Sequence, residues 1–294
     1  MIENSKITVD VDNCTKCKAC VNECPRSLYY FESDQLSFAD EFEELCIECS
    51  HCVAVCPVNI IQLKTVSITD VKEIKEQEKK ADFTSISNLI KTRRSIRQFK
   101  EKAVPKDLIQ KILDIARYAP TGHNEENVHY TVFQDREILK QFSDEITKQI
   151  TNLCNMYTDP KGRESLKSTL PNTIFEKLEE NVLNFKKHLE EIKKGRDVWR
   201  RNAELIIIHS PKTAMTPVEN CSLAAGHIML AAESLGLGTC SLGYATAFIN
   251  QFKTVSKIVK LPRDHKVAYT LAIGYPNVKY FRIPARKTLK ADWI

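Results

Sequence analysis

The sequence lacks the features that mark membrane-spanning, dinucleotide-binding and low-complexity proteins. No stretch of its 294 residues reaches the apolar length of a membrane span, since the longest candidates, Leu205–Ile208 and Ile228–Ala232, are short core segments. A G-x-G-x-x-G fingerprint is absent, and Gly236-Leu237-Gly238 lacks the strand–helix context that such a fingerprint needs. Aromatic residues are few, at 8%, and no Gly/Pro-rich repeat occurs, so the composition predicts an ordinary globular protein.

Cysteine is abundant by comparison, and its spacing is the most informative feature of the chain. Eight of the eleven cysteines fall into two copies of one pattern, C-x2-C-x2-C-x3-C-P, which run from Cys14 to Pro25 and from Cys46 to Pro57. This spacing is typical of chains that hold cubane 4Fe–4S clusters. Tight turns bring three thiolates and several backbone N–H groups to one side, as a compact cluster requires. The sequence therefore predicts two 4Fe–4S clusters.

The fourth cysteine of such a run binds the other cluster in two-cluster proteins. Pro25 and Pro57 then turn the chain away, at positions where an N–H donor would have no partner. We therefore predict one cluster bound by Cys14, Cys17, Cys20 and Cys56, and a second bound by Cys46, Cys49, Cys52 and Cys24.

Other uses of the cysteines fit less well. Zinc usually takes ligands in two separate pairs rather than four cysteines in one run with a trailing proline. A disulfide framework would need a secreted chain, and Met1–Lys6 has no apolar segment of the kind found in signal peptides, so we expect none. The scattered thiols Cys154, Cys221 and Cys240 are expected to be small buried apolar residues.

Charge is distributed unevenly. Residues 1–60 carry four Lys or Arg against eleven Asp or Glu, whereas the remainder carries 39 basic against 27 acidic residues. Acidic surfaces on electron carriers favour docking to basic partners, which here include the chain's own second half. Nucleic-acid binding is the alternative interpretation of the basic part. Its basic residues are spread out and lack a stacking pattern of aromatics, so we expect neither a nucleic-acid nor a membrane partner.

The length suggests about two domains. We place a two-cluster domain at residues 1–65, a charged linker at 66–84 and a second domain at 85–294. Val71–Lys80 is charged and nearly free of apolar spacing, as expected of a solvated connector. Thr84-Ser85 can cap a helix that runs to Thr92.

The second domain has the pattern of an α+β layer fold with a small central sheet. Helices are predicted to begin at Pro105–Asp107 and to fill most of residues 136–197. Ala224–Leu235 is an almost wholly apolar helix, so we expect it to be buried on all sides. Leu205–His209 and Val267–Ile273 are predicted to be buried strands.

Four segments of this domain, in their order and spacing, resemble the nitroreductase family of FMN enzymes: Arg93–Phe99, Ala116–Asn124, Leu235–Gly243 and Arg282–Arg286. The resemblance covers roughly residues 85–294. The whole chain resembles a ferredoxin–nitroreductase fusion of the type found in anaerobic bacteria. This resemblance implies a nitroreductase-like α+β sandwich, with a central mixed sheet flanked by helices, in a homodimer that binds FMN at its interface.

The resemblance also implies which residues bind FMN. Guanidinium groups match phosphate oxygens bidentately, and small residues let backbone N–H groups approach the flavin's redox-active nitrogen. Arg282 is a second candidate for the C-terminal phosphate contact. The implied FMN-binding set is Arg93, Arg94, Ser95, Arg97, Pro120, Thr121, Asn124, Ser241, Leu242, Gly243 and Arg286.

The chain departs from the family pattern beside this set. Glu126-Asn127-Val128 replaces the usual Gln-Pro-Trp, which puts the wall of the substrate pocket in doubt. His123 is the candidate proton donor, although a histidine in a turn is more often a surface residue. The family places variable helices over the flavin where this chain has residues 136–197. Tyr157, Phe175 and Trp199 are candidates for a lid there, with core packing as the alternative.

The sequence thus predicts an FMN-dependent oxidoreductase that receives single electrons through two 4Fe–4S clusters and reduces a small organic acceptor of nitro, quinone or enone type. The donor would be reduced ferredoxin, another one-electron source or NAD(P)H. The alternatives are an electron carrier or redox module of a larger complex, and a related reaction such as reductive dehalogenation. We expect a cytoplasmic protein of an anaerobic bacterium or archaeon.

Overall fold

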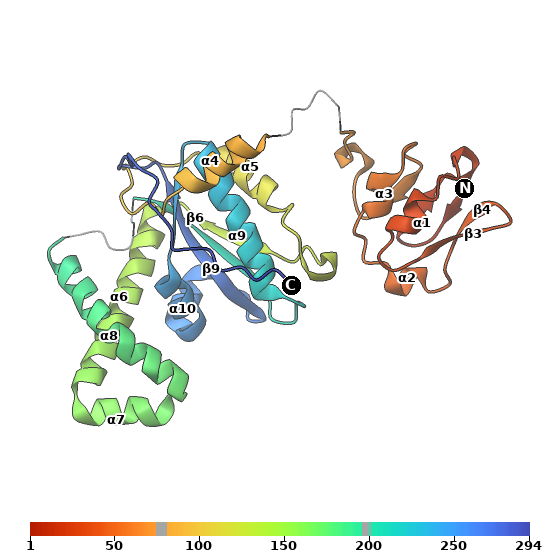
Figure 1. The fold of residues 1–294 in the computed structure, drawn as a ribbon. Helices are drawn as coiled ribbons and strands as arrows, with labels where there is room; N and C mark the ends of the chain where they lie inside the picture. The colour runs from red at the N-terminus through yellow and green to blue at the C-terminus, as the bar shows by residue number, and fades with distance from the viewer. Residues whose placement is uncertain (75–80, 196–199, 201) are drawn as a thin grey trace. The chain divides into compact units, whose positions relative to one another are not determined.

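The computed structural model describes residues 1–74, 81–195, 200 and 202–294 (Figure 1). The chain separates into two compact units. The first contains Met1–Ala81 together with Thr121–Glu126, and the second contains Asp82–Pro120 and Asn127–Ile294. The predicted linker lies partly outside the described residues, as does Trp199. Among the described residues, no helix is both long and apolar enough to cross a membrane.

The first unit consists of two small antiparallel sheets and short helices around one core. One sheet has the strand order β1-β2-β5 and the other pairs β3 with β4. Phe42 and Val53 from two helices pack beneath the strands with Ile7 and Leu63. The elements are β1 (Ile2–Glu3), β2 (Ile7–Val9), α1 (Ala19–Glu23), β3 (Tyr29–Glu32), β4 (Gln35–Phe38), α2 (Phe42–Leu45), α3 (His51–Val55) and β5 (Ile61–Leu63).

The two cysteine runs of this unit are structural copies of each other. Each cysteine of the first run recurs 32 residues later, and helix α3 follows α1 by the same interval. The backbone repeats too, because three non-glycine residues with positive φ recur at that interval. These pairs are Lys16 and Glu48, Lys18 and Ser50, and Ser27 and Asn59. Because the same unfavourable backbone conformations recur at matching positions, both runs present their thiols from the same backbone geometry.

The second unit is built on a four-stranded sheet of order β6-β7-β9-β8. The strands are β6 (His129–Phe133), β7 (Glu204–Pro211), β8 (Gly238–Ser241) and β9 (His265–Gly274). Both strands predicted from apolar runs are therefore confirmed, as is the α+β class. The sheet is mixed only through one short contact. Its four strands all pair antiparallel, and the parallel bridge found among the described residues joins Ser95 to Thr239.

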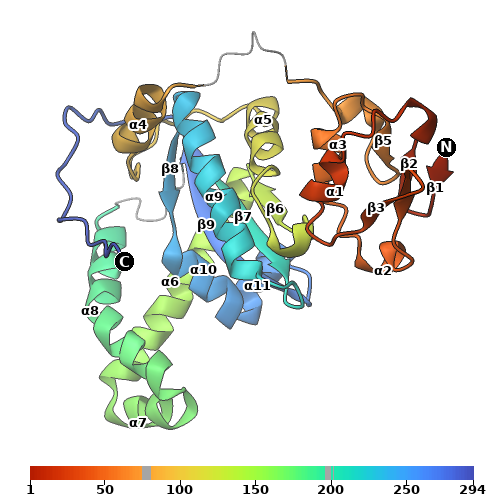
Figure 2. The ribbon, with the colours of Figure 1, turned by 45° about the vertical axis from the view of Figure 1, so that its right-hand side comes forward.

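Helices cover both faces of this sheet, which explains the continuous apolar run in β7. Ile206 and Ile208 point to the face covered by α5 and α9, and Leu205 and Ile207 point to the face covered by α6, α10 and α11. The helices α6, α7 and α8 pack on one another and extend away from the sheet, while α9 lies across it (Figure 2). The helices are α4 (Phe83–Thr92), α5 (Lys106–Ala116), α6 (Arg136–Thr158), α7 (Pro160–Thr169), α8 (Asn172–Lys193), α9 (Pro217–Ser234), α10 (Gly243–Gln251) and α11 (Lys253–Val259).

Two expectations for these helices are wrong. Helix α4 runs to Thr92, but its N-cap is Asp82, whose carboxylate accepts the Ser85 N–H at 2.9 Å. A carboxylate one residue before the helix is a good N-cap because it accepts a hydrogen bond from an otherwise unpaired N–H group. Its negative charge also interacts favourably with the N-terminal end of the helix. Helix α9 is not buried on all sides, because the sheet and α5 cover only part of it and Leu223 is 48% exposed.

The end of α9 and the three scattered thiols match expectation. Gly236 has φ +72°, and its N–H and that of Leu237 bond back to carbonyl groups in the last turn of the helix. Such a left-handed position is most easily filled by glycine. The thiols of Cys154, Cys221 and Cys240 are buried.

Candidate functional site

The structure gathers the eight motif cysteines of the first unit into two cavities. Each cavity is lined by three cysteines of one run and the last cysteine of the other run, the crossed arrangement expected for two clusters. One cavity contains Cys14, Cys17, Cys20 and Cys56, and the other contains Cys46, Cys49, Cys52 and Cys24. Their role as cluster ligands remains a prediction.

The donor set fits a cubane better than a single metal ion. Among the described residues, no group of three or more His, Cys, Asp or Glu side chains is placed to hold one metal ion. In a cubane each thiolate binds a different iron atom, so the four sulfurs stand around a cluster rather than around one point. The cavities thus match a cluster in the number and type of their ligands.

Backbone N–H groups point at the same sulfurs. The N–H of Lys16 donates to Cys14 Sγ at 3.4 Å, and the N–H of Leu28 donates to Cys24 Sγ at 3.5 Å. Left-handed residues beside right-handed ones, such as Lys18 before α1, turn successive N–H groups to one side and create a concavity that attracts negative charge. A cluster ligated by four thiolates is negatively charged, so this environment favours it.

Burial opposes ionisation of the inner thiols. It raises the pKa of Cys20 to about 11, and it also raises the pKa of Cys52. The neighbouring Tyr29 side chain partly offsets the rise at Cys52. At the rim, hydrogen bonds from the Ala19 backbone and from Thr15 lower the pKa of Cys17. Since iron ligands must be thiolates, the positive charge of the bound iron has to compensate for burial at the inner positions.

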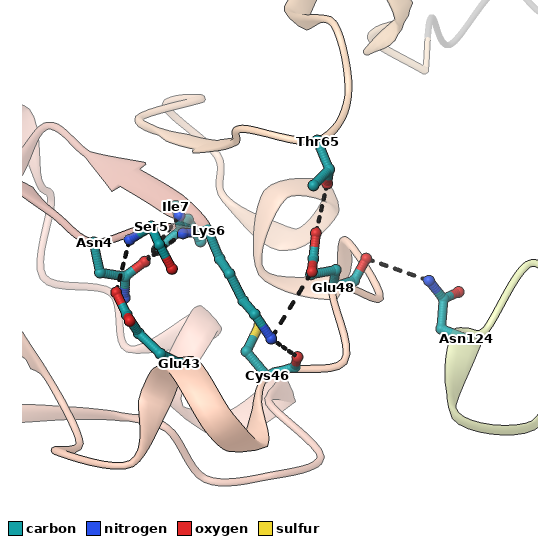
Figure 3. Close-up of polar contacts among 9 residues, drawn as sticks. All are labelled: Asn4, Ser5, Lys6, Ile7, Glu43, Cys46, Glu48, Thr65 and Asn124. Carbon is teal, nitrogen blue, oxygen red and sulfur yellow. Dashed lines mark hydrogen bonds and ion pairs between the residues drawn. The ribbon is translucent and has the colours of Figure 1, made fainter.

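A polar network holds the loop between Cys46 and Cys49 (Figure 3). Lys6 Nζ donates to the Cys46 carbonyl at 2.7 Å and lies 3.9 Å from Glu48 Oε1. The Glu48 carboxylate also accepts the Thr65 hydroxyl at 2.6 Å. Asn124 Nδ2 donates to the Glu48 carbonyl at 3.3 Å. The loop that presents two cysteines is therefore fixed from several sides.

The Thr121–Asn124 turn, predicted to contact FMN, groups with the first unit. Asn124 also donates to Glu126 Oε1 at 3.2 Å, and the Thr121 hydroxyl accepts the Glu126 N–H. His123 has φ 52° and is exposed. Thr121, His123 and Asn124 do not line the cavity that the second unit forms between Ser95 and Ser241.

That cavity has a volume of about 350 Å³. It brings together five of the predicted FMN-binding residues from two distant segments. Ser95 lies there because its bridge to Thr239, and the Ile96 N–H bond to the Thr239 carbonyl at 2.8 Å, fix the arginine-rich segment beside β8. The lining residues are Ser95, Arg97, His188, Arg200, Cys240, Ser241, Leu242, Gly243, Tyr244 and Ala245.

Two glycines shape this region differently. At Gly238 a Cβ atom would clash with the Ile96 side chain, lying 2.8 Å from Ile96 Cβ, so only glycine lets the two segments meet. A Cβ at Gly243 would meet no atom of the described residues within 4 Å, because that position faces open space in the cavity. The sequence interpretation noted small residues near 241–243 but missed the requirement at Gly238.

The other predicted FMN-binding residues lie outside the cavity. Arg93 faces Glu233, where its charge partly offsets the rise in the carboxyl pKa that burial causes. Arg94 and Pro120 do not line the cavity, and Arg282 and Arg286 are exposed in the extended segment after β9. Within one chain, Arg97 is thus the predicted arginine placed at the cavity.

His188 and Tyr244 are cavity residues that the sequence interpretation missed. Burial lowers the pKa of His188, and the nearby Arg200 charge lowers it further. His188 Nδ1 is buried without a hydrogen-bond partner among the described residues, and its ring packs edge-on against Tyr244 at 5.9 Å. The Tyr244 hydroxyl donates to Asn181 Oδ1 at 2.7 Å. No local sequence motif marks His188. Its position on helix α8 alone places it at the cavity.

Residues 90–275 match the model of the nitroreductase family, which covers more than half of the chain. The chain therefore belongs to the nitroreductase family. Residues 13–61 match a second model, described as a 4Fe–4S dicluster domain. The fusion architecture expected from the cysteine runs and the arginine-rich segment is confirmed.

Known relatives align with about two thirds of this chain. A protein of Archaeoglobus fulgidus named "Putative NADH dehydrogenase/NAD(P)H nitroreductase" is 27% identical over 64% of this chain and 84% of its own length. An iodotyrosine deiodinase of Thermotoga neapolitana is 24% identical over 65% of this chain and 88% of its own length. A solved nitroreductase with bound FMN from Bacteroides fragilis is 22% identical, covers 70% of this chain and 95% of that one, and has a TM-score of 0.48.

Proposed function

We propose that this chain is an FMN-dependent oxidoreductase that takes up single electrons at two 4Fe–4S clusters and reduces a small organic acceptor. One observation carries the proposal: two crossed cysteine quartets occur in the same chain as a nitroreductase-family domain with a cavity beside its arginine-rich segment. A free-standing electron carrier would not need that cavity.

The proposal assigns ligands and boundaries. Cys14, Cys17, Cys20 and Cys56 would hold one cluster, and Cys46, Cys49, Cys52 and Cys24 the other. The two-cluster domain would comprise residues 1–65, the linker 66–84 and the FMN domain 85–294. The partly exposed side of α9 supports a homodimer with FMN at its interface, to which a second chain would contribute residues absent from the cavity of the first.

Within the cavity, the chain's own residues would bind and orient. Arg97 would bind phosphate or ribityl oxygens, and the open face at Gly243 leaves room for a flat ring. Bound FMN would supply the capacity to accept electrons singly and to release them in pairs. In the small-residue segment Ser241–Gly243, the Gly243 backbone N–H would face the ring, since the Leu242 N–H bonds to the Thr270 carbonyl at 2.9 Å.

His188 is a better candidate than His123 for handling a proton. It lines the cavity and is held neutral near pH 7 by burial, so that one ring nitrogen donates and the other accepts. His123 is exposed on the Thr121–Asn124 turn. We therefore propose that His188 positions or protonates the acceptor.

A second candidate reaction is reductive dehalogenation. Its support is the relative named iodotyrosine deiodinase, which aligns with 65% of this chain. The same cofactors and the same cavity would serve, and only the acceptor would differ. The electron donor is proposed to be reduced ferredoxin or a similar one-electron source, with NAD(P)H as the alternative.

Anaerobic purification followed by iron, sulfide and flavin analysis tests the cofactors. We expect about eight irons, eight sulfides and one FMN per chain. Steady-state assays should then compare nitroarenes, quinones, enones and halophenols as acceptors, with a low-potential one-electron donor and with NAD(P)H. Zinc in place of iron, or absence of flavin, would overturn the proposal. Failure of every acceptor class to reoxidise the reduced flavin would favour an electron carrier.

A further inference from the structure

The two cysteine cavities are copies of each other, yet the buried strand residue beside each one differs. The 32-residue repeat that relates the runs places Tyr29 of β3 in register with Ile61 of β5. Both side chains are 3% exposed, and each lines the cavity of its own quartet. Tyr29 stands beside Cys46, Cys49, Cys52 and Cys24, whereas Ile61 stands beside Cys14, Cys17, Cys20 and Cys56.

The Tyr29 hydroxyl is buried and has no hydrogen-bond partner within the part of the chain that the structure describes. Its ring is held edge-on by Phe38 at 5.7 Å and by Phe42 at 5.4 Å, so it cannot swing out to water. An unpaired buried hydroxyl is costly, and native proteins rarely leave one without a reason. The cavity in front of Tyr29 supplies that reason if a hydrogen-bond acceptor occupies it.

The chemistry of the site identifies the acceptor. A phenol keeps its proton at neutral pH, so the Tyr29 hydroxyl can donate a hydrogen bond to an anionic neighbour. Thiolate and sulfide sulfurs are the acceptors that a cluster would present there. In the other cavity, the matching wall is formed by Phe31, Leu36, Ile60 and Ile61, which have no polar side-chain atom.

We propose that the Tyr29 hydroxyl donates a hydrogen bond to a sulfur of the cluster held by Cys46, Cys49, Cys52 and Cys24, and that this bond raises the reduction potential of that cluster. The inference rests on the proposed function, because it presupposes both clusters. Reduction adds one electron and no proton or new bond, and the added negative charge spreads onto the sulfurs. A fixed donor therefore stabilises the reduced form more than the oxidised form.

Other differences between the cavities act in both directions, because positive or polar groups near a cluster favour its reduced form. Arg26 and His51 line the Tyr29 cavity, where the repeat has Val58 and Ala19 in the other. In the opposite direction, Glu48 lines the Tyr29 cavity, whereas Thr15 and Lys18 line the other. The experiment must therefore isolate the hydroxyl from these neighbours.

Tyr29→Phe removes only that hydroxyl and keeps the ring that packs on Phe38 and Phe42. Tyr30→Phe is the matched control, because Tyr30 is the next residue of β3 and is 41% exposed. The full chain with both clusters would be titrated anaerobically while electron paramagnetic resonance follows each reduction. An ordinary hydrogen bond changes an equilibrium constant by about three- to tenfold. We expect one of the two midpoint potentials, that of the cluster beside Tyr29, to fall in Tyr29→Phe by up to the 59 mV that corresponds to tenfold for one electron.

The other potential should stay unchanged in Tyr29→Phe, and both should stay unchanged in Tyr30→Phe. With eight irons per chain, the absence of any shift, or an equal shift of both potentials, would overturn the inference. Fewer than eight irons in the unsubstituted protein would instead count against the proposed function. If Tyr29→Phe loses iron, 3-fluorotyrosine at position 29 reverses the test: its more acidic phenol donates more strongly and should raise one of the two potentials, and no rise would overturn the inference.

Discussion

The sites of the two units are assembled in different ways. In the first unit, each cavity takes three cysteines from one seven-residue stretch and a fourth from the other run. In the second unit, the cavity draws on segments as distant as Ser95, His188 and Ala245, which only the sheet and the packing of α8 bring together. The first kind of site is set by local spacing, whereas the second depends on the whole fold.

This difference has a consequence for how each site fails. Removing one ligand from a cubane leaves an iron without its thiolate, so the whole cluster is at risk. Removing one wall of a cavity with ten lining residues weakens binding but leaves the other contacts in place. Substitutions in the two units should therefore differ in kind, and the predictions below test that contrast.

The largest effect is expected at Cys20, which is buried beside Cys14, Cys17 and Cys56. Cys20→Ala should lower the iron count from about eight to about four per chain and leave bound FMN unchanged. Reduction of the flavin by a one-electron donor should slow. Cys154→Ala, in the buried core of the second unit, is the control and should keep all irons. Iron, sulfide and flavin analyses check both, and loss of FMN in Cys20→Ala would contradict the separability of the two sites.

The same contrast explains what the sequence could predict. Cysteine spacing anticipated which four thiols share each cavity, because a run of turns fixes the ligands independently of the rest of the chain. The strands around Ile206 and Leu271 were also predictable, since a sheet covered on both faces leaves a continuous apolar run. Ser95 and Gly243 were reached through the resemblance to a family rather than through spacing, and the structure does bring them together.

What could not be predicted depends on contacts between distant segments. His188 lies on a helix whose polar and apolar spacing gives no sign of the cavity. The clash that makes Gly238 necessary involves Ile96, which is far away in the sequence. The exposed side of α9 could not be predicted from its apolar sequence either. An apolar helix can be covered by its own chain or by another, and the sequence does not distinguish the two.

The second largest effect is expected at Gly238, where the arginine-rich segment meets β8. Gly238→Ala places a Cβ against Ile96 and should destabilise the second unit by about 3 kcal/mol, the upper end of the usual cost of overpacking. Urea unfolding followed by circular dichroism measures this. Gly226→Ala on α9 is the control, because its Cβ would meet nothing within 4 Å. The iron count of Gly238→Ala should not change; an equal cost in both variants would remove the special role of Gly238.

A smaller effect is expected from acid, again in the second unit alone. His209 is buried, and its Nδ1 lies 2.7 Å from the Nδ1 of His265, while the His129 ring stacks on it and Thr131 bonds its Nε2. Burial, then His265 and His129, lower the pKa of His209 to about 4. The unfolded chain takes up a proton near pH 6.5, which the folded chain refuses until about pH 4, so stability falls as the pH drops.

Between pH 7 and pH 5 this loss amounts to about 2 kcal/mol. Urea titrations at the two pH values should show a larger loss in the unsubstituted protein than in His209→Gln, where the lowered pKa values of His188 and His265 leave a residual dependence. The exposed His123 provides the control, and His123→Gln should keep the full pH dependence. A dependence that is undiminished in His209→Gln would assign it to other groups.

The smallest effect is expected at the first residue of the second unit, and it separates two positions for the cap of α4. Asp82 accepts the Ser85 N–H and hydroxyl in the structure, whereas the sequence pattern favoured Thr84-Ser85 as the cap. Asp82→Ala should therefore lower the melting temperature of the second unit by roughly 2–4 °C. Thr84→Ala, two residues further along the chain, is the matched control and should lower the melting temperature by less. If Thr84→Ala costs as much as Asp82→Ala, the helix is capped from within its first turn, and the second unit begins later than Asp82.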